Sequence, residues 1–142
     1  MKEYRELTPI FSDLVEETVR RLAAESPQEA EISEIYKKSR IESVQFTGNG
    51  FFVYFTADGE CVPDYRYTRV LHGETNALIG SNIVGFILFY REEKLCAIDC
   101  HSYSDTGTHP FPDMEEINGY SFFEEDELDR LIKDPKFRRK YF

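Results

Sequence analysis

The chain has 142 residues, the size of one compact domain, and 41% of them are hydrophobic, which is enough to build a core without metals or disulfides. Its 27 acidic and 17 basic residues give a formal net charge of −10. Binding to phosphate backbones requires clustered Lys and Arg, so this charge argues against nucleic acid as a partner. A negative field would steer a basic protein toward the chain, and the simpler interpretation is that the charge keeps the protein in solution. We therefore expect a single domain over residues 1–142.

Signals for export or membrane insertion are not found in the sequence. The amino-terminal residues are mostly charged, and the longest apolar run, residues 83–90, is shorter than the about 18 residues that a membrane span requires. These features predict a cytoplasmic protein with no membrane partner. Three cysteines, Cys61, Cys96 and Cys100, are an odd number in such a chain, so we expect reduced thiols in strands.

An amphipathic segment follows the amino terminus. Apolar residues recur at helical spacing from Leu7 to Leu22, with charged residues on the opposite face. Thr8 supplies an N-cap and Pro9 a first-turn proline, so the pattern predicts a helix that begins near residue 9.

The next segment has two possible structures. Ser26 can form a capping box with Glu29, which indicates a second helix that ends at about Lys38. Alternation of apolar and polar residues over residues 31–36 leaves a strand as the alternative.

A β-hairpin is predicted in residues 41–55. Residues 47–50, Thr-Gly-Asn-Gly, tolerate positive φ and mark its turn. In the second arm, Phe51 points to one face and Phe52 and Tyr54 to the other, so both faces are aromatic. Such a strand is expected to be central and covered on both sides.

Residues 56–82 are rich in turn residues, and within them residues 66–71 could form a strand. A second hairpin is indicated by the apolar residues 83–90 and 94–103, which a short charged turn separates. Alternation on its outgoing arm places Leu95, Ala97, Asp99, His101 and Tyr103 on one face, and Cys96, Ile98, Cys100 and Ser102 on the other.

The remaining residues are mainly polar. A loop over residues 104–118 precedes a short helix over residues 124–133, whose first acidic residues suit the positive end of the helix dipole. The tail, residues 135–142, is basic and aromatic, and we expect it either to dock on the acidic surface or to fray.

Metal binding is one hypothesis for residues 96–109, where five side chains could serve as ligands. Cys100 and His101 face opposite sides of a strand, and no CxxC or HxxxH pair is present, so we predict no metal and no cofactor. The five residues are Cys96, Cys100, His101, Asp105 and His109.

Catalysis is the second hypothesis. Cys61 or Cys100 would need a histidine partner, but free cysteines are usually buried, so we predict no catalytic residue. Asp99 lies within a hydrophobic strand, where a carboxylate either faces solvent or pairs with a cation or hydroxyl. A pocket around Asp99 and His101, in a small enzyme or ligand-binding domain, is therefore the alternative to a binding protein.

Acidic and aromatic side chains concentrate in the last third of the chain. Acids steer a basic protein and aromatic rings anchor it, whereas the alternative is a solvated loop and helix face. We predict a partner-binding surface that consists of Asp99, His101, Tyr103, Asp105, Asp113, Glu115, Glu116, Tyr120, Glu124 and Glu125.

Two motifs resemble those of a family of small bacterial proteins. Residues 46–52 (Phe-Thr-Gly-Asn-Gly-Phe-Phe) are similar to its FTGxGFF hairpin. Residues 85–89 (Gly-Phe-Ile-Leu-Phe), followed by residues 95–103, are similar to its GFxLF motif and the hydrophobic strand after it, which ends in a YxY-like motif. That strand tends to carry a Glu in the family, whereas Asp99 and His101 lie there in this chain. The family is similar to the immunity proteins of polymorphic toxins, so the resemblance implies a cytosolic protein that neutralises a toxin.

These observations together predict an α+β fold. We expect one antiparallel sheet of five or six strands, with the amino-terminal helix and a short carboxy-terminal helix packed on it. The expected function is non-enzymatic binding of a basic protein, and the resemblance implies that this protein is a toxin.

Overall fold

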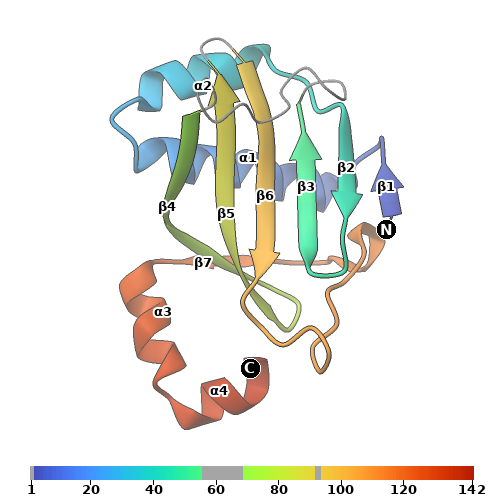
Figure 1. Cartoon of the computed structure of the whole chain (residues 1–142), viewed down its shortest axis with the longest axis vertical. Helices are drawn as coiled ribbons and strands as arrows, with labels where there is room; N and C mark the ends of the chain where they lie inside the picture. Colours follow the sequence, from blue (N-terminus) through green and yellow to red (C-terminus); the bar gives the residue numbers. More distant parts are fainter. Residues whose placement is uncertain (1, 56–68, 92–93) are drawn as a thin grey trace.

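The computed structural model describes residues 2–55, 69–91 and 94–142, which form a seven-stranded antiparallel sheet and four α-helices (Figure 1). The strands lie in the order β1-β2-β3-β6-β5-β4-β7. The elements are β1 (Lys2–Tyr4), α1 (Pro9–Ala24), α2 (Glu29–Lys38), β2 (Ser43–Phe46), β3 (Gly50–Tyr54), β4 (Arg69–Ile79), β5 (Asn82–Arg91), β6 (Lys94–Ser102), the 3-10 helix η1 (Met114–Glu116), β7 (Ser121–Phe123), α3 (Glu125–Ile132) and α4 (Pro135–Tyr141).

The predicted α+β architecture is confirmed, although the sheet has more strands than expected. The additional edge strands, β1 and β7, have three residues each. A three-residue strand is too short to show an alternating pattern, so the sequence contains no signal for either.

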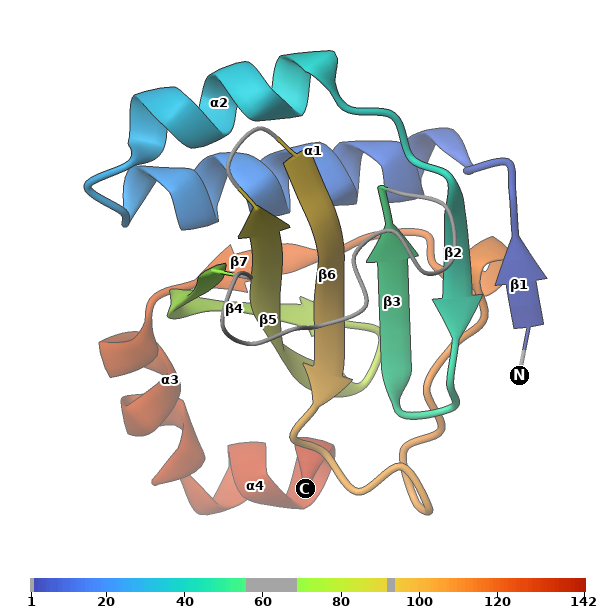
Figure 2. The same cartoon turned by 45° about the horizontal axis from the view of Figure 1, so that its top comes forward.

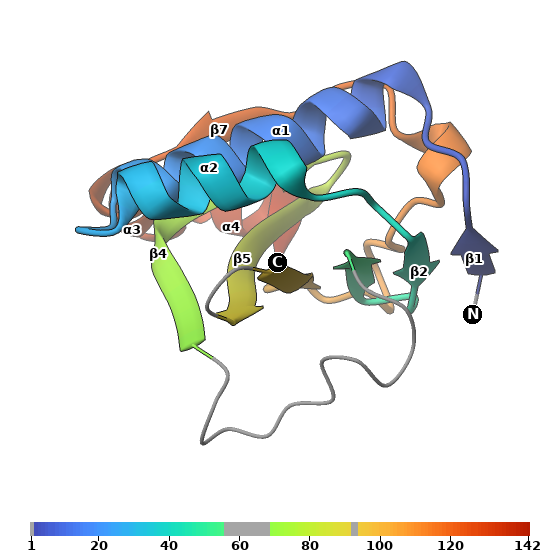
Figure 3. The ribbon, with the colours of Figure 1, turned by 90° about the horizontal axis from the view of Figure 1, so that it is seen from above.

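Helices α1 and α2 lie together on one face of the sheet (Figure 3), and α3 and α4 lie on the other side of β4 and β7 (Figure 2). Helices α1 and α2 cover the face that contains the main core, to which β5 contributes Val84, Phe86 and Leu88. On the opposite face, Ile83 of β5 packs with Leu128 of α3 and Tyr141 of α4. Helices α3 and α4 therefore cover the β4–β5–β7 end of the sheet.

Helix α1 begins as the sequence predicts. The Thr8 side chain accepts a hydrogen bond from the backbone N–H of Phe11 at 3.3 Å, and Pro9 is the first helical residue. Phe11 is fully buried, with its ring 4.9 Å from that of Phe51 and 5.7 Å from that of Phe46. This aromatic contact joins α1 to the first hairpin.

The second segment is a helix, and the strand alternative over residues 31–36 is wrong. Its N-cap is Gln28, two residues after the predicted cap, and the Ser26 hydroxyl instead accepts a hydrogen bond from the Gln28 N–H at 3.0 Å. The burial of Ile32 and Ile35 on one side of α2 decides between the two periodicities.

Both predicted hairpins are present. Gly48 has a φ of +87° in the β2–β3 turn, and β3 is paired on both sides, by β2 and β6. Its faces differ, however, because Phe51 is buried whereas Phe52 and Tyr54 remain partly exposed. The prediction that β3 is covered on both sides is therefore wrong for its second face.

Strand β4 extends through much of the segment in which the sequence indicates turns. It pairs with β5 through a turn at Gly80, where φ is +60°, and the register shifts between His72 and Asn76. Residues 56–68, which include the first half of the predicted strand at 66–71, lie outside the described residues, and residues 69–71 belong to β4.

The alternation predicted for β6 holds from Ala97 to Ser102 but fails at its start. A register shift beside Phe89 and Tyr90 places both Leu95 and Cys96 in buried positions. Leu95 consequently belongs to the main core rather than to the face of Asp99.

The cysteines differ from the prediction of reduced thiols. Cys96 is disulfide-bonded, whereas Cys100 is a free, buried thiol, and Cys61 lies outside the described residues. The prediction is wrong at Cys96, because spacing along the chain does not show which cysteines meet in space.

The carboxy-terminal tail forms a helix that docks on the sheet. In α4, Asp134 caps the first turn. Phe137, Tyr141 and Phe142 pack with Ile83 and Leu128 in the smaller hydrophobic cluster. Helix α3 ends one residue before the predicted Lys133. The tail therefore docks through its aromatic residues and does not fray.

The contribution of a side chain of β3 to the free energy of unfolding depends on the face of the sheet that it occupies. We expect Phe51→Ala to lower the free energy of unfolding by about 3–5 kcal/mol, because the ring is buried in the main core. Phe52→Ala, one residue along and partly exposed, should cost about 1–2 kcal/mol. Chemical denaturation measures both values, and equal losses would contradict the assignment of the two faces.

Candidate functional site

Three of the predicted binding residues converge on one face of the sheet. Asp99 and His101 lie on β6 two residues apart, and Tyr103 follows directly after the strand, so alternation places all three on the same side. We call Asp99, His101 and Tyr103 the β6 cluster. Its face is the one opposite α1 and α2, since the intervening Ile98 and Cys100 belong to the main core.

A chain of short contacts joins the three side chains. His101 Nε2 lies 3.2 Å from the Tyr103 hydroxyl, and the two rings meet edge to face at a centroid distance of 5.1 Å. Asp99 Oδ1 lies 3.9 Å from His101 Nδ1, which is an ion-pair separation but too long for a hydrogen bond. The histidine therefore bonds to Tyr103 rather than to Asp99.

Gly85 on the neighbouring strand β5 makes room for this contact. It pairs with His101, and a Cβ atom placed on it would overlap the Tyr103 hydroxyl and lie 3.0 Å from His101 Nε2. The Tyr103 ring thus lies across the backbone at Gly85, a position that any larger residue would block.

The backbone after β6 is held by buried polar groups. The Tyr103 N–H donates to the Ile83 carbonyl at 2.8 Å, and the Ile83 N–H donates to the Ser104 hydroxyl at 3.0 Å. The buried Asn82 accepts from the Ser102 hydroxyl at 2.7 Å. These bonds fix the direction in which Tyr103 leaves the sheet.

Burial changes the titration of the cluster. Desolvation raises the pKa of Asp99 above its ordinary value, and the nearby His101 opposes this effect. The pKa of Tyr103 is also raised, mainly by desolvation and then by the negative charge of Glu125. Glu125, in the first turn of α3, is therefore the predicted acidic residue whose charge acts on the cluster.

Aromatic and aliphatic side chains surround the cluster on the same face. Phe52 of β3 and Ile87 of β5 are the register partners of Asp99, and both are partly exposed. Phe52 also stacks on Tyr54, with a centroid distance of 5.9 Å and an interplanar angle of 17°. Tyr103 is the one exposed large hydrophobic residue among the described side chains, at 50% of its full exposure.

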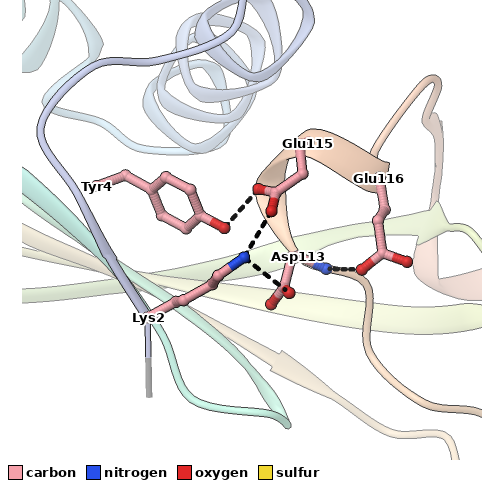
Figure 4. Close-up of polar contacts among 5 residues, drawn as sticks. All are labelled: Lys2, Tyr4, Asp113, Glu115 and Glu116. Carbon is pink, nitrogen blue, oxygen red and sulfur yellow. Dashed lines mark hydrogen bonds and ion pairs between the residues drawn. The ribbon is translucent and has the colours of Figure 1, made fainter.

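The acidic residues of η1 are engaged within the molecule (Figure 4). The Lys2 ammonium on β1 lies 2.6 Å from Glu115 and 3.4 Å from Asp113. The Tyr4 hydroxyl donates to the other Glu115 oxygen, and Glu116 accepts from the Asp113 N–H at 3.0 Å in a capping box. This group, Asp113, Glu115 and Glu116, ties β1 to the loop before β7.

The remaining predicted residues lie in three separate environments. Asp105 closes its own loop, where its carboxylate accepts from the Gly107 N–H at 2.9 Å, a bond that lowers its pKa. Tyr120 is partly buried in the main core on the α1 side, edge to face with Phe122. Glu124 is the N-cap residue of α3. The predicted surface is therefore not one continuous patch around Tyr103.

Cys100 does not pair with His101. Cys100 is fully buried on the opposite face from His101, and burial raises the pKa of its thiol well above the ordinary value. Within residues 2–55, 69–91 and 94–142, no three His, Cys, Asp or Glu side chains are grouped as a metal site would require.

The fold and the site define a domain of the α+β class with a polar and aromatic cluster on the second face of its sheet. No protein-family model, curated protein or solved structure matches this chain. Among the described residues, no helix combines the length and apolar character of a membrane span.

Two features of the site are not evident from sequence spacing. Gly85 reads as a residue that interrupts an apolar run, and its role depends on pairing with His101. Phe52 is adjacent to Asp99 only because β6 inserts between β3 and β5. The alternation within β6 is the signal that did identify the cluster.

We expect Gly85→Ala to displace the Tyr103 ring and to lower the free energy of unfolding by about 1–3 kcal/mol through overpacking. The cost should be smaller in a Tyr103→Ala background, because the obstructing ring is then absent. Gly119→Ala is the control, since its Cβ would meet no atom within 4 Å. Equal costs of Gly85→Ala in both backgrounds, from thermal or chemical unfolding, would show that the close approach is not made.

The contact between Lys2 and Glu115 predicts acid sensitivity at the β1 edge. Hydrogen bonds from Lys2 and Tyr4 lower the pKa of Glu115 from 4.5 to about 2. Because the folded-state pKa is the lower one, this contribution to β1 pairing is complete above pH 4.5 and is lost as the pH falls toward 2.

Hydrogen exchange and carboxylate NMR titration measure this effect. We expect Glu115→Gln to speed amide exchange in β1 at neutral pH, whereas Glu127→Gln, on the exposed face of α3, should leave it unchanged. A Glu115 titration midpoint near 4.5 in the folded protein would contradict the assigned contacts.

Proposed function

We propose that this chain is a non-enzymatic binding protein whose β6 cluster receives a basic protein partner. The observation that carries the proposal is the exposed ring of Tyr103, held beside His101, whose other ring nitrogen lies 3.9 Å from the partly buried carboxylate of Asp99. An aromatic residue fixed in place and flanked by a partly desolvated charge has the features of a binding hot spot.

Charge supports a basic partner. The net charge of −10 attracts a cationic protein from a distance, and Glu125 adds negative charge beside Tyr103. The rings of Phe52 and Tyr54 extend the contact area on the same face. Asp113, Glu115 and Asp105 contribute to the overall field, since their carboxylates already bond within the molecule.

Immunity to a basic toxin is the most concrete form of this function. The immunity function rests on the resemblance of residues 46–52 and 85–89 to a bacterial family that is similar to immunity proteins. An immunity protein of this kind would act in the cytoplasm. Disulfides are rare in the cytoplasm, so the disulfide of Cys96 is the observation that speaks against this location.

A second candidate is a ligand-binding domain or small enzyme at the same cluster. The contact between His101 and Tyr103, together with the raised pKa of Asp99, favours it, because perturbed titratable groups often gather at reactive sites. Cys100 takes no part in this candidate, since it is buried on the other face.

The test compares tagged baits in a lysate of the source organism. We expect the native chain to retain one basic protein in stoichiometric amount, and Tyr103→Ala and Asp99→Asn to reduce its recovery at least tenfold, as for hot-spot residues. Glu31→Gln, an exposed acid on α2, is the charge-matched control and should retain the protein.

The outcomes separate the two candidates. Recovery that is the same for all four baits would place the interface away from the β6 cluster and contradict the proposal. If none of the baits retains a protein, the second candidate is favoured. A small-molecule screen then tests that candidate, with the NMR signals of His101 and Tyr103 as the readout.

A further inference from the structure

Among the described residues, Asp99 has no lysine or arginine as an ion-pair partner. In the part of the chain that the structure describes, its one ion-pair contact is His101 at 3.9 Å. Its register partners, Phe52 and Ile87, offer no charge and no hydrogen-bond donor in their side chains. A carboxylate in a partly desolvated position is costly to leave without compensation.

Many basic side chains of the described residues are in ion pairs with groups of opposite charge. Five of the lysines and arginines in the amino-terminal half are in ion pairs with carboxylates, namely Lys2, Arg5, Arg20, Arg21 and Lys37. None of these ion pairs involves Asp99. Among the described residues, the Asp99 carboxylate therefore has no lysine or arginine paired with it, and we consider which cation from a partner would suit it.

The rings of Tyr103 and of β3 on this face restrict the kind of cation that fits. The Tyr103 hydroxyl is already in contact with His101, so the half-exposed ring offers its π surface rather than a hydrogen bond. Phe52 and Tyr54 add a stacked pair on the adjacent strand. A cation that binds Asp99 must therefore lose part of its hydration shell where it contacts apolar and aromatic groups.

A guanidinium group meets both requirements. It is planar and weakly hydrated, it stacks on aromatic rings, and its paired N–H donors match a carboxylate. An ammonium group is more strongly hydrated and binds as a point charge, so it loses more hydration free energy when it enters the same site.

We infer that the β6 cluster is a receptor for a single arginine side chain, bound by the Asp99 carboxylate with its guanidinium plane against the ring of Tyr103. The inference rests on the proposed function, because it names the chemistry by which the basic partner is anchored. It also gives Gly85 a role, because the absence of a side chain there lets the Tyr103 ring lie against His101.

The test is an NMR titration with three small probes. N-acetyl-arginine methylamide should bind with a dissociation constant on the order of millimolar, as expected for so small a ligand, and should shift the ring signals of Tyr103 and His101. N-acetyl-lysine methylamide should bind at least about threefold more weakly, and the uncharged N-acetyl-citrulline methylamide should cause no saturable shift.

Variants assign the site of binding. Asp99→Asn keeps the size of the side chain and should weaken the arginine probe at least tenfold, because the charged acceptor is lost. Asp126→Asn, on the exposed face of α3, should leave its affinity unchanged. Equal binding of the arginine and citrulline probes, or an unchanged affinity in Asp99→Asn, would overturn the inference.

This experiment can fail independently of the pull-down. If a basic protein is retained through Asp99 and Tyr103 but the arginine probe does not bind, the proposed function stands and the arginine receptor is wrong. If the probe binds in the expected manner and no protein is retained, the receptor stands and the proposed protein partner is wrong.

Discussion

The contact between Phe11 of α1 and the rings of Phe46 and Phe51 is the interaction on which the two faces of the sheet depend. It fixes which side of the first hairpin faces the helical layer. Because side chains alternate along a strand and β6 pairs with β3, Ile98 and Cys100 must then follow Phe51 into the core. Asp99 and His101 are left on the second face, beside Phe52. The position of the site thus follows from a hydrophobic contact on the opposite side of the sheet.

Sequence patterns predicted the parts of this fold that have a sustained period. The amphipathic α1 segment and the two hairpins were identified from spacing and turn residues, and the alternation within β6 placed Asp99, His101 and Tyr103 on one face. The strands β1 and β7 were not predicted, because three residues carry no period. Leu95 was placed on the wrong face because a register shift near Tyr90 interrupts the alternation.

The candidate site was predicted less completely than the fold, for a different physical reason. The acidic residues from Asp105 to Glu125 are close together along the chain, but the fold distributes them among a loop, η1 and the start of α3. Lys2 lies beside Glu115 across more than a hundred residues of sequence, a pairing that no local pattern can show. In contrast, β6 is a single extended element, so its sequence order is also its spatial order. Residues on one strand can therefore be grouped from sequence, whereas residues on loops cannot.

The sheet ends on both sides in a very short strand, and this limits its contacts with other copies of the chain. An exposed edge with many free backbone groups is a template for aggregation, because another strand can pair along it. Here β1 has three residues and carries the charged Lys2 and Glu3, whereas on the other side the three residues of β7 pair with only Asn76–Leu78 of the longer β4. The long, hydrophobic strands β5 and β6 lie in the interior of the strand order. The fold thus shields its most aggregation-prone strands from intermolecular pairing.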